Sequence, residues 1–102
     1  MYKNLAAAFA AACFFFPLSS TSAAEPLKVG FVYVAPITEA GWVRQHENAR
    51  QALEKNLGAR VKTSYVENVA EGADAERVIR DLAQQGNQLI FTPSFGYMEP
   101  TL

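Results

Sequence analysis

The few residues of this chain that could do chemistry point to binding rather than to catalysis. Its 102 residues include one histidine, His46, and one cysteine, Cys13, whereas a zinc site normally needs four nitrogen, sulfur or oxygen ligands at short spacing. Ser94 stands in the sequence PSFGY and not in the G-x-S-x-G turn that exposes a hydrolase nucleophile. Gly30 stands alone, without the companion glycines of a phosphate-binding loop. The sequence therefore predicts no catalytic residue, no metal site and no cofactor.

Two short stretches carry side chains that suit a planar, partly apolar ligand. Trp42 lies in the first stretch, and Phe95 and Tyr97 lie in the second. Stacked aromatic rings gain about 0.5–1.5 kcal/mol beyond the area that they bury. The Ser94 hydroxyl, the Tyr97 hydroxyl and the backbone N–H groups around Gly96 can orient such a ligand through hydrogen bonds. We therefore expect a binding site that these five residues help to form.

Each candidate also has a purely structural interpretation. Trp42 is equally consistent with a core anchor that packs a helix onto a sheet, since a large aromatic ring contributes most of its energy by burial. Phe95 and Tyr97 are equally consistent with side chains that pack against a following helix or against an absent partner. His46 lies one helical turn beyond Trp42, where a structural histidine is more typical than a ligand contact.

Hydropathy patterns predict that strands and helices alternate from residue 27 onward. Runs that are continuously apolar or that alternate in polarity are typical of strands, and they occupy residues 27–34, 60–66 and 88–92. Between them, apolar residues at three- and four-residue steps predict helices that end at Gly58 and Gly86. We expect the first and third strands to be buried and the second to lie at a sheet edge.

The first predicted helix, from about residue 40 to Gly58, has an amphipathic pattern. Its apolar face includes Trp42 and His46, and Glu47 and Arg50 belong to the opposite, solvent-facing set. We therefore expect these two charged residues to lie on the outside of the protein.

The β-α-β-α-β order predicts an α/β fold with a parallel three-stranded sheet and flanking helices. Connections of this length are too long for hairpins, and right-handed crossovers favour the strand order 2-1-3 with one helix on each face. The chain then reverses direction between the first and third strands, and ligands of open α/β sheets bind at such a switch point. The loops there are residues 35–41 and 93–98.

The first 24 residues have the three parts of a secretory signal peptide. Lys3 provides the positive charge, residues 5–18 form an uncharged apolar run, and Ala24 ends a stretch of small residues suited to cleavage. We expect export to the periplasm, with residues 25–102 as the mature α/β domain. An uncleaved membrane anchor is the alternative. Lipid attachment at Cys13 is disfavoured, because the apolar run continues past it.

The charge balance argues against nucleic acid as a partner. The formal net charge is -1, and nucleic-acid-binding domains usually carry a strongly basic patch. Charges of both signs are interspersed along residues 44–81, which is typical of a solvated surface.

Three stretches of the sequence resemble a known family. They are LKVGFVYVAPITEAGWVRQHENARQALEK, YVENVAEGADAERVIRDLAQQGNQLIF and the SFGYM loop. They resemble the basic membrane protein family of substrate-binding proteins of ABC importers, similar to the purine nucleoside receptor, across essentially all of residues 27–102. The resemblance implies two α/β lobes of periplasmic-binding-protein type I, a purine base or nucleoside held between them, and an ABC permease as partner. The membrane would be contacted only through the permease or an uncleaved signal.

The resemblance also implies roles for individual residues. Trp42 matches the aromatic residue that stacks on the base, and Glu39 matches an acidic residue shortly before it. Val43 stands where the family often has an asparagine, so the polar contacts are expected to differ. Family members are much longer than this chain, which predicts a truncated fragment holding part of the N-terminal lobe and half of the cleft.

Two other functions compete with transport. An exported flavodoxin-like sensor or protein-interaction domain could bind a partner through the open edge of the third strand, since an unpaired strand edge is a template for association. An exported hydrolase lacks any candidate catalytic constellation, and we do not expect one.

Overall fold

The computed structural model describes residues 19–20 and 22–102. Residues 1–18 and 21 of the expected signal peptide, among them Cys13, therefore lie outside the described residues. The strands are β1 (Leu27–Val32), β2 (Val61–Val66) and β3 (Leu89–Phe91), and the helices are α1 (Trp42–Leu57), α2 (Ala73–Gln84) and α3 (Met98–Thr101). None of these helices combines the length and the apolar character that crossing a membrane requires.

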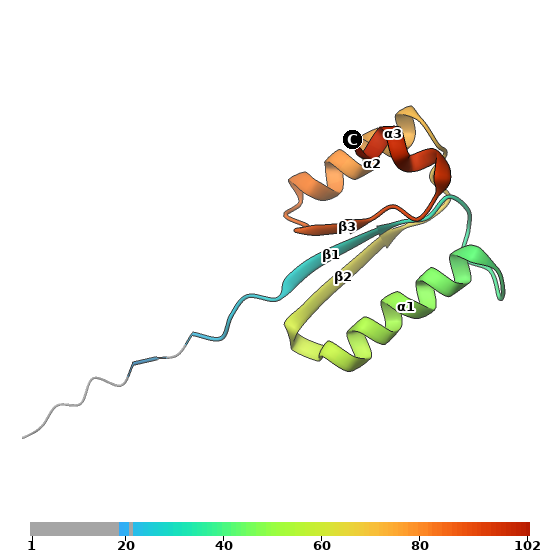
Figure 1. Ribbon diagram of the computed structural model, residues 1–102. Coiled ribbons are helices and arrows are strands. Elements are labelled where there is room, and N and C mark those ends of the chain that lie inside the picture. The colour runs from blue at the N-terminus through green and yellow to red at the C-terminus, as the bar shows by residue number, and fades with distance from the viewer. Residues whose placement is uncertain (1–18, 21) are drawn as a thin grey trace, which may run out of the picture.

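The three strands form one parallel sheet in the order β2-β1-β3. α1 covers one face of the sheet, and α2 and α3 lie on the other (Figure 1). This arrangement confirms the predicted α/β fold and strand order. It follows from right-handed crossovers on opposite sides of a central strand. The carboxyl ends of all three strands consequently meet at the same edge of the sheet.

The core consists of two clusters, one on each face of the sheet. On the α1 face, Val29, Phe31 and Tyr33 pack with Val43. On the α2 face, Val32 packs with five other buried residues: Val69, Ala75, Val78, Leu82 and Tyr97. Successive side chains of a strand point to opposite faces, so β1 supplies both clusters. The prediction that the first strand is buried on both sides is confirmed.

The third strand is less buried than its apolar sequence predicts. Leu89 and Phe91 are 43% and 42% exposed, so the expectation of a fully buried strand is wrong for the chain as described. Both residues pair with β1 residues of the α1 face, and the Phe91 ring stacks on Phe31 at 4.9 Å. α1 packs against β2 and, through Val43, against the β1 residues of this face, whereas β3 makes its main contacts with β1 and α2.

Glu47 corrects the predicted outer face of α1, because its side chain is buried. Only 3% of the residue is exposed, and its carboxylate accepts hydrogen bonds from the Tyr33 hydroxyl at 3.0 Å and from Arg50 Nε at 2.8 Å and Nη2 at 2.5 Å. Gln51 donates a further bond of 3.1 Å. A buried charge is tolerated only when it is paired and hydrogen-bonded in this way. The network ties α1 to the end of β1.

Arg50 extends this network to β2. Its Nη1 donates to the Thr63 hydroxyl at 2.9 Å, and its guanidinium lies 4.8 Å from the centre of the Tyr65 ring. A planar guanidinium can pair with a carboxylate and lie over an aromatic face at the same time. Arg50 therefore connects α1 to β2 directly and, through Glu47, to Tyr33 beyond the end of β1, although the sequence pattern assigned it to solvent.

The network predicts how stability depends on pH. The hydrogen bonds from Arg50, reinforced by those from Tyr33 and Gln51, hold the pKa of Glu47 below its ordinary value of 4.5, against the opposing effect of burial. A carboxyl whose pKa is lowered by folding stabilises the protein above its unfolded pKa. That contribution is lost as the pH falls through the lowered, folded-state pKa.

We predict that Glu47→Gln lowers the free energy of unfolding by about 1–3 kcal/mol at neutral pH, because Arg50 loses its buried charged partner and keeps only the more exposed Glu54. The variant should also lose less stability than the wild type on acidification below about pH 4.5, the ordinary pKa of this group. Urea unfolding followed by circular dichroism measures both effects. The matched control is Glu76→Gln, which breaks only an exposed pair with Arg80 and should cost less than about 0.5 kcal/mol. Equal losses in the two variants would contradict the role of Glu47.

Candidate ligand-binding edge

Two of the loops at the carboxyl edge of the sheet are joined directly through Trp42. Gly41 has a φ of 100°, which glycine adopts without steric cost, and α1 begins at the next residue. The indole Nε1 of Trp42 donates a 2.6 Å hydrogen bond to the backbone carbonyl of Pro93. The structure therefore brings together the loop that follows β1 and the loop that follows β3.

The Trp42 ring is 64% exposed, so Trp42 does not serve as a core anchor in the described structure. It meets the His46 ring edge-on, with the centroids 4.8 Å apart and the planes at 66°. His46 is half-buried one turn further along α1 and supports the indole from the helix side. The hydrogen bond to Pro93 holds the other end of the ring. The ring is thus exposed to solvent and yet fixed in orientation.

Residues 93–98 were expected to form a loop, but they contain helical turns. A 3-10 turn spans Phe95–Tyr97, and α3 follows directly. Phe95 is 97% exposed, whereas Tyr97 is completely buried. The sequence analysis gave both aromatic residues the same expected role, but their environments are opposite. Residues two apart lie on different sides of a tight helical turn.

Tyr97 belongs to the core, and this corrects the expectation that its hydroxyl faces a ligand. The hydroxyl donates a 2.6 Å bond to the Val69 carbonyl, inside the cluster on the α2 face. Burial, with a smaller contribution from the Glu71 carboxylate, raises the pKa of Tyr97 to about 12. The group is therefore a neutral donor at ordinary pH. Its role is to hold the turn that presents Ser94 and Phe95.

Ser94 and Gly96 are partly exposed at this edge. The Ser94 hydroxyl donates a 2.7 Å hydrogen bond to Glu71 Oε1. Glu39 is exposed three residues before Trp42, and the structure shows no hydrogen bond that joins its carboxylate to the other candidates among the described residues. Five of the six candidate residues are thus clustered or connected, with Tyr97 turned inward, and Glu39 stands apart on its loop.

The connection between β2 and α2, residues 67–72, is the part of the edge that sequence reasoning missed. Its Glu67 carboxylate accepts a 2.7 Å hydrogen bond from the Ile37 N–H, in the loop after β1. Its Glu71 carboxylate accepts the bond from Ser94, in the loop after β3. A signal was present in the sequence: in a parallel sheet, the residues after every strand lie at the same edge, so two glutamates after the second strand belong beside the other loops.

The edge is acidic. The connecting residues 33–41, 67–72 and 92–97 contain Glu39, Glu67 and Glu71 and no lysine or arginine. Arg44, on the first turn of α1, donates its Nε–H to the Thr38 carbonyl. Carboxylates accept hydrogen bonds and repel anions. The arrangement therefore suits a neutral or cationic molecule that carries N–H or O–H groups and a flat face for stacking.

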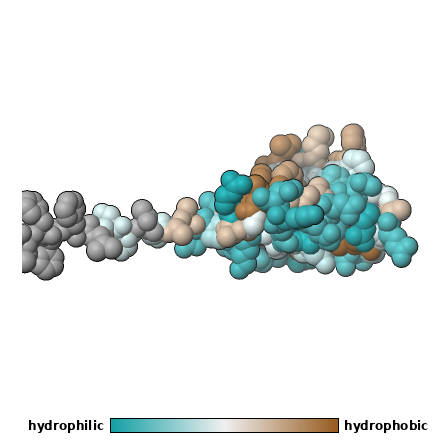
Figure 2. Space-filling model, turned by 90° about the horizontal axis from the view of Figure 1, so that it is seen from below, coloured by the Kyte–Doolittle hydropathy of each residue, from teal (hydrophilic) through white to brown (hydrophobic). Residues whose placement is uncertain are grey.

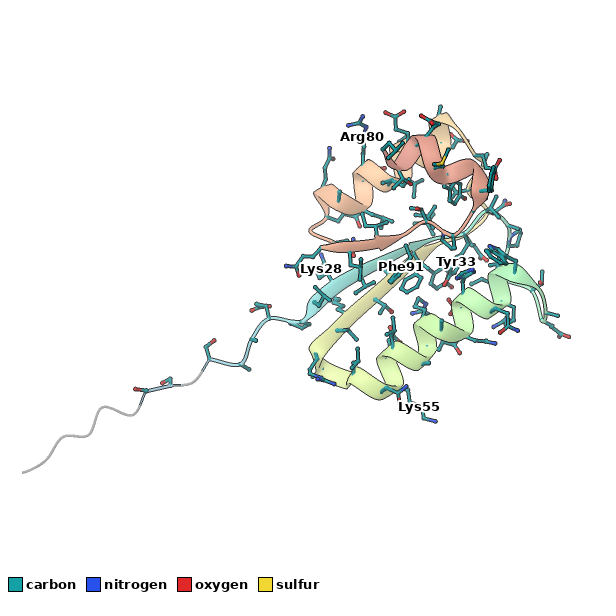
Figure 3. The ribbon with its side chains drawn as sticks, viewed as in Figure 1. Lys28, Tyr33, Lys55, Arg80 and Phe91 are labelled. Atoms are coloured by element: carbon teal, nitrogen blue, oxygen red, sulfur yellow. The ribbon has the colours of Figure 1, made fainter. Side chains whose placement is uncertain are left out.

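A second surface, an apolar groove, lies on the α1 face beside β3. Its volume is about 520 Å³, and it is lined mainly by Phe31 and Phe91 of the sheet and by residues of α1 that include His46, Leu53 and Leu57. Tyr33 and Phe91 both lie on the side of the sheet that faces α1 (Figure 3). Seen from the α1 side, apolar surface gathers toward one side of the molecule (Figure 2).

The amino-acid sequence matches one protein-family model and is similar to known proteins. A family model described as Bmp, ABC transporter substrate-binding protein PnrA-like, matches residues 27–101. A protein named as purine-binding, from Brucella abortus (strain 2308), is 58% identical over 80 residues, which are 78% of this chain and 23% of the relative. A protein named as a candidate glucose-binding protein of an ABC transporter, from Haloferax volcanii, is 37% identical over 79 residues, 78% of this chain and 20% of the relative. The chain thus spans less than a quarter of either relative.

The opposite environments of the two aromatic residues in the 3-10 turn give a direct test. Phe95→Ala should change the free energy of unfolding by less than about 0.5 kcal/mol, because the ring is in solvent. Tyr97→Phe should lower it by about 1–3 kcal/mol, because the Val69 carbonyl loses its buried donor. Urea unfolding followed by circular dichroism measures both variants under the same conditions. A larger loss for Phe95→Ala than for Tyr97→Phe would contradict the placement of the two rings.

Proposed function

The chain belongs to the Bmp family of PnrA-like ABC transporter substrate-binding proteins, and from that membership we propose that its carboxyl edge forms one wall of the ligand cleft of an ABC importer's binding protein. We further propose that the ligand is a purine base or nucleoside. Binding and delivery to a permease, without chemical conversion of the ligand, are the activity. The observation that carries the proposal is the Trp42 ring, which is exposed at the switch point of the sheet and fixed by hydrogen bonding.

Stacking explains why a fixed, exposed indole suits a purine. A planar heterocycle that lies on an indole gains area burial and a favourable ring-on-ring geometry. The bond to Pro93 and the contact with His46 orient the indole before the ligand arrives, so little side-chain entropy remains to be lost on binding. Phe95, almost fully exposed on the neighbouring turn, offers a second aromatic surface.

Hydrogen-bond acceptors explain the polar part of recognition. Purine bases and ribose present N–H and O–H groups, and the edge offers Glu39 and Ser94 to receive them, with the Glu71 carboxylate beside Ser94. The name of the relative at 58% identity supports a purine. The relative at 37% identity is named for glucose, and a sugar also combines hydroxyl groups with a face that stacks on aromatic rings. A sugar is therefore the second candidate ligand.

The proposal places the ligand between this wall and a second one. The relatives are more than four times as long as the matched segment, and we propose that the remaining surface of the cleft is formed by a second lobe. Residues 1–24 would direct export as a signal peptide, so that the binding protein works in the periplasm and meets the membrane only at its permease. We do not propose nucleic acid as a partner, because the carboxylates of the edge would repel its phosphate groups.

A protein-interaction domain without a transport role remains the competing function. The half-exposed side chains of Leu89 and Phe91 on the outer strand favour it, because an exposed apolar strand edge invites pairing with another chain. This alternative requires the purified chain to associate through β3. Sedimentation that shows a monomer at all concentrations, with purine binding present, would eliminate it.

Substitution of Trp42 tests the proposal. Residues 27–101 would replace the matching segment of the Brucella abortus relative, which supplies the remaining surface, and the chimera would be titrated calorimetrically with adenine, guanosine and glucose. Trp42→Ala should weaken purine binding by about 1–3 kcal/mol, roughly five- to 150-fold in dissociation constant, through lost stacking. Trp42→Phe should recover much of that loss.

The control for this titration is Leu89→Ala, which removes a half-exposed apolar side chain at the start of β3, at the opposite edge of the sheet. It should leave the affinity unchanged. Unaltered affinity in Trp42→Ala would rule out stacking on this ring. Glucose binding without a purine signal would replace the purine by the sugar.

A further inference from the structure

We propose that the connection between β2 and α2 positions the binding edge, and that the Glu71 carboxylate is a latch that fixes the loop carrying Ser94 and, through Pro93, the orientation of Trp42. This inference goes beyond the proposed function, because it assigns a positioning role to residues outside the expected ligand contacts. The effect of the latch on ligand affinity rests on the proposed function. The contacts that form the latch are present without any ligand.

The connection is anchored first to the end of β1. The Val69 N–H donates to the Tyr33 carbonyl at 2.9 Å, and the Asn68 N–H donates to the Ala35 carbonyl at 3.3 Å. Asn68 has a φ of 55°, a left-handed conformation that asparagine tolerates better than most residues. The turn at Asn68 lets the chain leave β2 and cross the carboxyl end of β1 toward β3.

The connection then binds the loop after β3 at two points. The Val69 carbonyl accepts the Tyr97 hydroxyl at 2.6 Å, and Glu71 Oε1 accepts the Ser94 hydroxyl at 2.7 Å. The first bond is buried, and the second is exposed and charge-assisted. Together they fix both ends of the short segment between Ser94 and Tyr97.

Gly96 leaves the room that the latch needs. A Cβ atom built on Gly96 would lie 2.0 Å from the carboxyl carbon of Glu71 and 2.1 Å from its Oε2. These separations are far shorter than any van der Waals contact, so the carboxylate rests where a side chain at this position would stand. Gly96 is therefore a close-approach glycine, and its partner is the same carboxylate that holds Ser94.

The peptide group between Pro93 and Ser94 connects the Glu71 latch to Trp42. The Pro93 carbonyl, which accepts the indole N–H at 2.6 Å, belongs to the residue directly before Ser94. Any displacement of Ser94 moves that carbonyl, and the indole loses the acceptor that orients it. Glu71 and Trp42 are thus coupled although they lie on different connections of the sheet.

The latch also determines what the serine offers a ligand. A hydroxyl has one proton to donate and two lone pairs to accept. Because the Ser94 proton is donated to Glu71, the hydroxyl oxygen can meet a ligand only as an acceptor. If the proposed function holds, this edge selects ligands that present N–H or O–H donors to Ser94 and disfavours those that present carbonyl oxygens there.

The test uses Trp42 as a reporter on the 102-residue chain itself. Trp42 is the chain's single tryptophan, so a nitrogen–proton NMR spectrum has one indole N–H signal to assign. In Glu71→Leu, this signal should move toward the position of a freely hydrated indole. Its exchange with solvent should speed up about fivefold, the factor for one net hydrogen bond. In Glu71→Gln the amide oxygen still accepts from Ser94, and most of the wild-type signal should be retained.

Two further variants keep the test decisive if Glu71→Leu folds poorly. Ser94→Ala removes only the donor and should produce the same indole shift. Gly96→Ala should also shift the signal in the wild-type background but have little further effect in a Glu71→Ala background, because the clash has gone. Glu76→Leu, which removes an exposed glutamate on the outer side of α2, is the matched control and should leave the indole signal in place.

An indole signal that stays unchanged in both Glu71→Leu and Ser94→Ala would overturn the latch. A shift of equal size in Glu76→Leu would also overturn it, since the effect would then be general. The absence of purine binding in the titration of the chimera would remove the proposed function but leave these indole results standing, so the two failures are distinguishable.

Discussion

The binding edge depends on the burial of β1 along both of its faces. A strand that packs against α1 on one side and α2 on the other cannot shift without opening both core clusters. The carbonyl groups of Tyr33 and Ala35, just beyond the end of β1, are therefore held in place, and the connection after β2 is hydrogen-bonded to them. That connection carries Glu71, whose carboxylate accepts the Ser94 hydroxyl, so the contact of Glu71 with the loop after β3 depends on these two carbonyls.

The fold could be predicted from the sequence because its determinants are local and periodic. Apolar runs indicated β1 and β3, and alternating polarity indicated β2. Apolar residues at three- and four-residue steps indicated α1 and α2, and the handedness of crossovers indicated the strand order β2-β1-β3. Two boundaries differ from the prediction: β1 ends at Val32, two residues early, and the 3-10 turn Phe95–Tyr97 lies within the loop expected over residues 93–98. Such short turns depend on tertiary contacts such as the bond from Tyr97 to Val69, which hydropathy does not encode.

For the candidate site, the sequence indicated which loops lie together but not the contacts within them. Switch-point reasoning selected the loops that contain Trp42 and Ser94, and the structure joins those loops through Pro93. The same reasoning could not separate Phe95 from Tyr97, because both are aromatic and only the helical turn decides which is buried. Glu47 was assigned to solvent because amphipathic patterns count a charge as exposed, whereas its partners Tyr33 and Arg50 make burial tolerable.

Two of the regions where the described residues expose apolar side chains differ in their chemistry. At the carboxyl edge, the rings of Trp42 and Phe95 stand among carboxylates and a serine hydroxyl, so an occupant must combine a flat face with hydrogen-bond donors. In the groove between α1 and β3, the lining is mostly carbon, and it can be covered only by other apolar side chains. Exposed apolar patches of this kind mark surfaces that act in binding or packing. α1 contributes Trp42 to the edge and Leu53 and Leu57 to the groove. Any side chain that packs in the groove therefore contacts the same helix that carries the indole.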